Sequence, residues 1–122
     1  KMIDMKISKQ DGTSSLLHGM LFKNEKNYSE AKIYLEESIR FGNAQAMYEY
    51  AQILFKKKNK EAFNYYQKSI DKLYPPAMYK YGLILMNENN KEEGMKFIKM
   101  SADNGYPKAK YHYSDLLKKW YK

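Results

Sequence analysis

Two histidines and no cysteine leave this chain of 122 residues with a narrow choice of side-chain chemistry. Ser14 stands four residues before His18, one helical turn away, which is a spacing that a nucleophile and its base can share. Helix capping and packing account for both residues, and His112 shares no metal-ligand spacing with His18. The residues therefore predict a chain that is not an enzyme and has no catalytic residues, metal site or cofactor.

Lysines also cluster in this sequence and could bind an acidic partner. The formal net charge is +8, and lysines cluster in KKKNK at 56–60 and in KKWYK at 118–122. Nucleic-acid binding needs a continuous basic stripe along the phosphates, and three glutamates interrupt such a stripe within 88–93. The sequence therefore favours an acidic peptide over nucleic acid as the partner of this basic rim. Its residues are Lys56, Lys57, Lys58, Lys60, Lys118 and Lys119.

A repeated pattern must position these residues. AMYEYAQILF at 46–55 returns as AMYKYGLILM at 77–86 and as AKYHYSDLL at 109–117, and a degenerate copy, SSLLHGMLF, occupies 14–22. A second pattern lies between these copies and reads AKIYLEESIRFG, AFNYYQKSIDKL and GMKFIKMSADNG. A fixed period of this length is typical of a solenoid.

Both patterns have apolar residues at the spacing of a helix face. We expect first helices near 14–23, 45–57, 76–87 and 108–121, and second helices near 28–41, 60–73 and 91–103. Asn27, Asn59 and Asn90 stand where a side chain accepts from the free N–H groups of a second helix. Gly42 and Gly105 follow second helices, and Pro76 and Pro107 fit the first turn of first helices.

Small residues recur at one place in each helix. Gly19, Ala51 and Gly82 on first helices and Ala31, Ala62 and Gly94 on second helices would let the two helices of a repeat approach closely. The predicted fold is therefore all-α: a right-handed α-solenoid of antiparallel helix pairs, with about three and a half repeats in a single domain, 1–122. The repeats lie near 14–43, 44–75 and 76–106, followed by the terminal helix, and 1–10 is a half-repeat.

The second-helix pattern resembles that of Sel-1-like repeats, which are related to tetratricopeptide repeats. Their second helix reads like Lys-Ala-x-x-Trp-Tyr-x-Lys-Ala-Ala and is followed by Gly-x-x-x-Ala; KEAFNYYQKSIDKLYPPA (60–77), KEEGMKFIKMSADNGYPKA (91–109) and SEAKIYLEESIRFGNAQA (29–46) are similar. Ser-Ile replaces Ala-Ala twice, and the glycine-rich turn between the helices is missing. The resemblance implies a protein–protein scaffold or adaptor without catalytic residues.

The paired tyrosines of the first helices lie two residues apart and therefore face about 200° apart. Tyr50, Tyr81 and Tyr113 fall on the core stripe, where His18 takes the same place in the first repeat. Tyr48, Tyr79 and Tyr111 must face elsewhere. In tetratricopeptide-like solenoids the first helices line the concave wall, so these rings either seal neighbouring helices together or offer a peptide a flat contact surface.

We therefore expect an adaptor that binds a peptide segment or a partner protein on its concave face. The expected partner-binding residues are Leu16, Tyr48, Gln52, Phe55, Tyr79, Leu83, Met86, Tyr111 and Asp115. The alternatives are nucleic-acid binding through the basic rim and self-association into a homo-oligomer through the helix faces at Met2–Ile7 or Trp120. No apolar run reaches the length of about 18 residues that a membrane span needs, and the lack of cysteine favours a cytoplasmic location.

Overall fold

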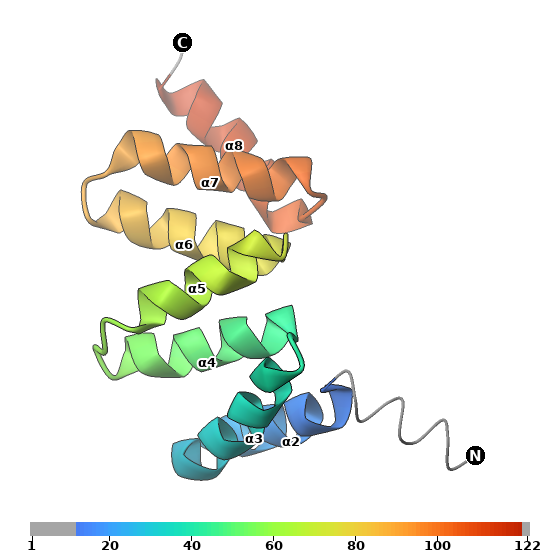
Figure 1. Ribbon diagram of the computed structural model, residues 1–122. Helices are drawn as coiled ribbons and strands as arrows, with labels where there is room; N and C mark the ends of the chain where they lie inside the picture. Colours follow the sequence, from blue (N-terminus) through green and yellow to red (C-terminus); the bar gives the residue numbers. More distant parts are fainter. Residues whose placement is uncertain (1–11, 121–122) are drawn as a thin grey trace. The chain divides into compact units, whose positions relative to one another are not determined.

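The structure, a computed structural model, describes residues 12–120 as an all-α chain without strands (Figure 1). Each predicted first and second helix is present, and most boundaries lie within one or two residues of the expected ones. The helices are α2 (Thr13–Asn24), α3 (Tyr28–Arg40), α4 (Ala44–Lys56), α5 (Ala62–Asp71), α6 (Pro75–Asn87), α7 (Lys91–Asp103) and α8 (Pro107–Trp120). The half-repeat expected at 1–10 lies outside the described residues.

The helices form two compact units. The N-terminal unit ends at Ser69 and contains α2, α3, α4 and most of α5; the C-terminal unit begins at Ile70 and contains α6, α7 and α8. Within the first unit α3 packs against α2 and α4, and within the second α7 packs against α6 and α8. The expected helix pairs α2–α3 and α6–α7 are therefore confirmed, and ring contacts join α4 to α5. The single domain expected for the whole chain stays a prediction.

The turns show why the helices end where they do. A residue with left-handed backbone follows each helix from α2 to α7, and that conformation stops a helix because it turns the chain out of the helical path. These residues are Lys26, Gly42, Lys58, Leu73, Asn89 and Gly105. Two of the predicted positions, Gly42 and Gly105, are confirmed here. Four of the six are not glycine, so the residue type did not predict most of these helix ends.

Asparagine side chains fix some of the helix starts. Asn27 accepts from the N–H of Glu30, and Asn59 accepts from the N–H of Glu61, as expected. The expected cap at Asn90 is wrong, because its side chain makes no capping hydrogen bond. Asn43, which the pattern did not single out, accepts from the N–H of Ala46 and caps α4.

Small residues do bring the paired helices together. A Cβ atom on Gly82 would lie 2.8 Å from the carbonyl oxygen of Gly94, and one on Gly94 would lie 2.8 Å from the carbonyl oxygen of Gly82. In the N-terminal unit, a Cβ on Gly19 would lie 2.7 Å from a methyl carbon of Leu35. The expected close approach is therefore confirmed at all three glycines, and at α6 and α7 it is a contact between two backbones.

The repeated serine of each second helix forms a hydrogen bond to the start of the first helix in the same repeat. The Ser38 hydroxyl donates to the carbonyl oxygen of Gly12, and Ser101 donates to that of Pro75, both at 2.8 Å. Ser69 makes the same bond to the carbonyl oxygen of Ala44 at 2.8 Å. All three serines are fully buried. Each serine hydroxyl therefore bonds a carbonyl oxygen at the start of the first helix of its repeat, which an alanine side chain could not do.

Candidate partner-binding surface

The core stripe of the first helices is confirmed in α4, where Tyr50 is buried with Met47, Ala51 and Leu54. The expectation that His18 also faces the core is wrong. Its side chain is exposed, its ring stacks on Tyr34, and its Nδ1 atom lies 2.9 Å from the carbonyl oxygen of Ser14. The contact therefore involves the backbone of Ser14 and not its hydroxyl. It fits the packing of a side chain in the first turns of a helix.

The predicted partner-binding residues of the N-terminal unit have unequal positions. Tyr48 and Gln52 are half-buried on α4, and the side chain of Phe55 near its end is 38% exposed. Leu16 on α2 is only 7% exposed. Because α2 lies against both α3 and α4, this side chain belongs to the core, and we remove Leu16 from the candidate surface.

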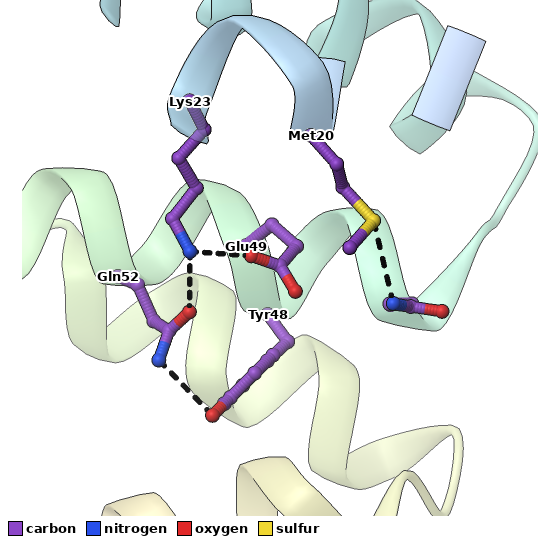
Figure 2. A network of polar contacts seen from close by, with 6 residues as sticks. Met20, Lys23, Tyr48, Glu49 and Gln52 are labelled. Atoms are coloured by element: carbon purple, nitrogen blue, oxygen red, sulfur yellow. Dashed lines mark hydrogen bonds and ion pairs between the residues drawn. The ribbon is translucent and has the colours of Figure 1, made fainter. Parts of the chain in front are cut away.

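A polar network joins α2 to α4 beside Tyr48 (Figure 2). The Lys23 ammonium donates to Glu49 Oε1 at 2.6 Å and to Gln52 Oε1 at 2.9 Å. The other end of the Gln52 amide donates to the Tyr48 hydroxyl at 3.0 Å. The chain of contacts therefore connects the Tyr48 hydroxyl, through Gln52, to the ion pair between Lys23 on α2 and Glu49 on α4.

Lys23 and Glu49 were not among the residues that the sequence singled out. The Glu49 side chain is 9% exposed and the Lys23 side chain 25% exposed, so the pair is largely removed from water. A buried carboxylate is stable only with a partner. The available signal was a glutamate beside the buried stripe of α4, but its partner lies in another repeat and becomes visible only when the helices are packed.

Tyr48 and Phe55 pack against aromatic side chains of α5. The ring of Tyr66 on α5 is fully buried and lies 6.2 Å from the ring of Tyr48 and 6.4 Å from that of Phe55. Phe55 also packs edge-on against Phe63 at 6.1 Å. Rings of α5 therefore support Tyr48 and Phe55, and both residues remain partly exposed.

Two buried tyrosine hydroxyls of this unit predict opposite effects for the same substitution. The Tyr66 hydroxyl has no hydrogen-bond partner among residues 12–120, whereas the Tyr50 hydroxyl donates to Glu36 Oε2 at 2.7 Å. We expect Tyr66→Phe to raise the free energy of unfolding by about 1 kcal/mol and Tyr50→Phe to lower it by about 1 kcal/mol, because an unpaired buried hydroxyl is costly and a paired one is favourable. Urea unfolding followed by circular dichroism measures both.

The same two groups predict how stability depends on pH. Burial raises the pKa of both Tyr50 and Tyr66, and the Glu36 carboxylate raises that of Tyr50 further. Because the folded-state pKa lies above the ordinary value of about 10, the stabilisation is complete below that pH and is lost as the pH rises beyond it. Tyr66→Phe should weaken this alkaline loss; an unchanged pH profile together with unchanged stability would contradict the assignment.

The C-terminal unit holds its first-helix tyrosine in a similar way. Tyr79 on α6 packs against the rings of Tyr106 and His112 at 5.6 and 5.7 Å, and its hydroxyl lies 3.1 Å from His112 Nδ1. Burial raises the pKa of Tyr79, with a smaller contribution from Tyr106. The predicted residues Leu83 and Met86 are half-buried and pack with Tyr79 against the core of this unit.

Helix α8 presents the remaining residues of the prediction. Tyr111 is 76% exposed, and Asp115, one turn further along the helix, is also exposed. The opposite side of α8 is buried through Ala109 and Leu116. Of the three off-core tyrosines, Tyr111 is therefore a surface residue, whereas Tyr48 and Tyr79 pack on one side and remain partly open on the other.

All residues of the basic rim are exposed. At the end of α4 the ammonium groups of Lys56 and Lys57 lie 5.8 and 5.6 Å from the centre of the Tyr28 ring. Lys118 and Lys119 lie in the last turn of α8, where a positive charge also complements the helix dipole. No helix within residues 12–120 is long and apolar enough to cross a membrane.

The comparisons with known proteins agree with the helical-repeat fold. Residues 13–41, which comprise α2, its turn and α3, match the family model of the tetratricopeptide repeat. The fold is similar to that of a Sel1 repeat protein from Oxalobacter formigenes, with a TM-score of 0.69, 18% identity, and coverage of 93% of this chain and 97% of that chain. The comparison with curated proteins found no match.

The chain therefore contains helical repeats with a fold similar to that of Sel1-like and tetratricopeptide repeats, and residues 13–41 match one tetratricopeptide repeat. Repeats of this class generally mediate protein–protein interaction and are typically non-catalytic scaffolds.

Proposed function

We propose that this chain is a non-catalytic adaptor that binds a peptide segment or a partner protein through the off-core tyrosines of its first helices. The main support for the proposal is a tyrosine with a hydrogen-bonded hydroxyl that occurs once in each unit. Tyr48 and Tyr79 occupy the same place in their repeats, and a neighbouring side chain fixes each hydroxyl: Gln52 in one unit and His112 in the other.

Fixed rings are useful for binding because they lose little conformational freedom when a partner arrives. Each of these rings packs on neighbouring aromatics and keeps part of its surface open, so it offers apolar area with a polar edge. Tyrosine with this combination is common at the centre of protein interfaces. The chemistry therefore fits a segment with apolar anchor residues and nearby hydrogen-bonding groups.

The residues that flank the tyrosines extend the surface. Phe55 on α4, and Leu83 and Met86 on α6, add partly exposed apolar area. Gln52 in the N-terminal unit and Asp115 in the C-terminal unit add polar groups. The proposed surface therefore keeps all the residues expected from the sequence except Leu16.

The test compares two triple variants of the full chain. Tyr48→Ala/Tyr79→Ala/Tyr111→Ala removes the three proposed contact rings. The control, Ile33→Ala/Phe41→Ala/Met100→Ala, removes three exposed apolar side chains, which lie on α3, at its C-cap and on α7, respectively. A protein partner is first captured by affinity purification with the unaltered chain, and its affinity for each variant is then measured by calorimetry.

We expect the tyrosine variant to weaken the partner's binding at least about a hundredfold, because central aromatic residues carry most of the energy of an interface. The control variant should change the affinity by less than about threefold. Circular dichroism must show that both variants keep their helices. Equal affinity of a folded tyrosine variant would exclude this surface, and loss of binding in the control variant alone would move the interface to the second helices.

A further inference from the structure

A basic patch with an aromatic centre lies in the N-terminal unit, and its ring is none of the three off-core tyrosines. Tyr28 is the first residue of α3, and Lys56 and Lys57 end α4. Both ammonium groups lie within 6 Å of the Tyr28 ring centre, at 5.8 and 5.6 Å. Two positive charges are thus gathered at a single half-buried ring.

The turns on either side add further charge. Lys26 precedes Tyr28 by two residues, and Lys58 and Lys60 continue the turn after α4. Lys26 and Lys58 both have left-handed backbone conformations, with φ values of 61° and 59°. None of these side chains, nor those of Lys56 and Lys57, has an ion-pair partner among residues 12–120.

The attraction of a ring for a cation is weak at an exposed site, and it acts against the mutual repulsion of the lysines. An anion that enters the patch removes this repulsion and leaves both ring contacts in place. The side chains are lysines rather than arginines, so they act as mobile point charges and do not select the planar geometry of one bidentate ligand. This arrangement suits several separate carboxylates.

We propose that Tyr28 and the surrounding lysines bind an acidic segment of a protein partner, in which glutamates or aspartates stand beside an apolar residue. The apolar residue would contact Phe55, which directly precedes Lys56 and is partly exposed. Glu25, Glu30 and Glu61 stand close along the chain to the lysines and limit the patch to a short ligand. A long phosphate backbone requires a track without such negative charges.

The test uses the full chain and a fluorescein-labelled peptide that contains a run of glutamates and one leucine, with fluorescence anisotropy as the readout. A second peptide has glutamine in place of every glutamate. A labelled oligothymidylate with the same number of negative charges represents nucleic acid. Binding is measured at low and at physiological salt, because contacts between exposed charges weaken as salt rises.

Three variants locate the binding. Lys56→Gln/Lys57→Gln removes two charges from the patch, and Lys118→Gln/Lys119→Gln removes the same charge from α8. Tyr28→Leu removes the ring, with Tyr28→Phe as its matched control. We expect the first variant to weaken binding of the glutamate peptide about tenfold and the second to change it less than twofold. Tyr28→Leu should weaken it several-fold, and Tyr28→Phe should not.

The proposal fails if the glutamate peptide does not bind, if the glutamine peptide binds as well, or if both lysine variants lose the same affinity, which would indicate a response to net charge alone. Tighter binding of oligothymidylate through the same lysines would assign the patch to nucleic acid and overturn the proposal. This test does not involve Tyr48, Tyr79 or Tyr111. Its failure and the failure of the proposed function are therefore distinguishable.

Discussion

Gly94→Ala should lower the free energy of unfolding of the C-terminal unit by about 2–3 kcal/mol, although alanine is the better helix former. The added methyl group would lie 2.8 Å from the carbonyl oxygen of Gly82 and 3.0 Å from the backbone nitrogen of Met86, and it would also overlap the Met86 side chain. Two of these three atoms belong to the backbone of α6. The helices must therefore separate, and no rotation of a side chain can relieve the contact.

Trp120 gives this prediction a local probe. It is the chain's single tryptophan, and it packs against the core of the C-terminal unit. Its fluorescence during urea unfolding therefore reports on the unit that contains Gly94. Gly19→Ala is the matched comparison in the N-terminal unit, where circular dichroism replaces the tryptophan signal. It should cost less, because the nearest atoms there belong to the flexible side chain of Leu35. A Gly94→Ala protein as stable as its parent would show that α6 and α7 are not in close backbone contact.

Lys23→Met should lower the free energy of unfolding by about 2 kcal/mol, because it leaves the buried Glu49 carboxylate without its partner. The substitution also releases the Gln52 amide, which holds the Tyr48 hydroxyl (Figure 2). The double variant Lys23→Met/Glu49→Leu should recover most of the loss, because a buried pair replaced by apolar side chains leaves no charge unpaired. Urea unfolding of the two single variants and the double variant gives the coupling between the residues.

An exposed pair on α7 supplies the control. Lys99 and Asp103 lie 2.9 Å apart, but their side chains are 55% and 61% exposed. Lys99→Met should leave the unfolding midpoint unchanged within error, because water screens such pairs. If Lys23→Met were equally silent, or if the double variant were no more stable than Lys23→Met, the network beside Tyr48 would not be the structural support that the contacts indicate.

The helices could be predicted from the sequence because the same pattern of residues recurs in each repeat. Three well-formed copies of the tyrosine pattern fix the phase of the first helices, and prolines and asparagines mark most of the starts. The close approach at Gly82 and Gly94 was also predictable, because a small residue recurs at the same place in each pattern. These features depend on neighbours along the chain or on the repeat itself.

Features that join two repeats were not predictable in the same way. Lys23 and Glu49 are 26 residues apart, and nothing in either repeat pattern assigns them to each other. The burial of Leu16 follows from the packing of α2 against two helices, whereas its counterpart in the next repeat, Tyr48, stays half-exposed. The cap at Asn90 was not predictable from residue type, because Asn27 forms its cap with a similar backbone conformation and Asn90 does not.

The most direct test of the proposed function is to map the binding surface by nuclear magnetic resonance. The amide spectrum of the labelled chain is recorded while the captured partner, or the shortest peptide of it that binds, is added. The proposal predicts that the largest shifts occur around Tyr48 on α4, Tyr79 on α6 and Tyr111 on α8. Shifts confined to the second helices α3 and α7, with the first helices unaffected, would contradict it.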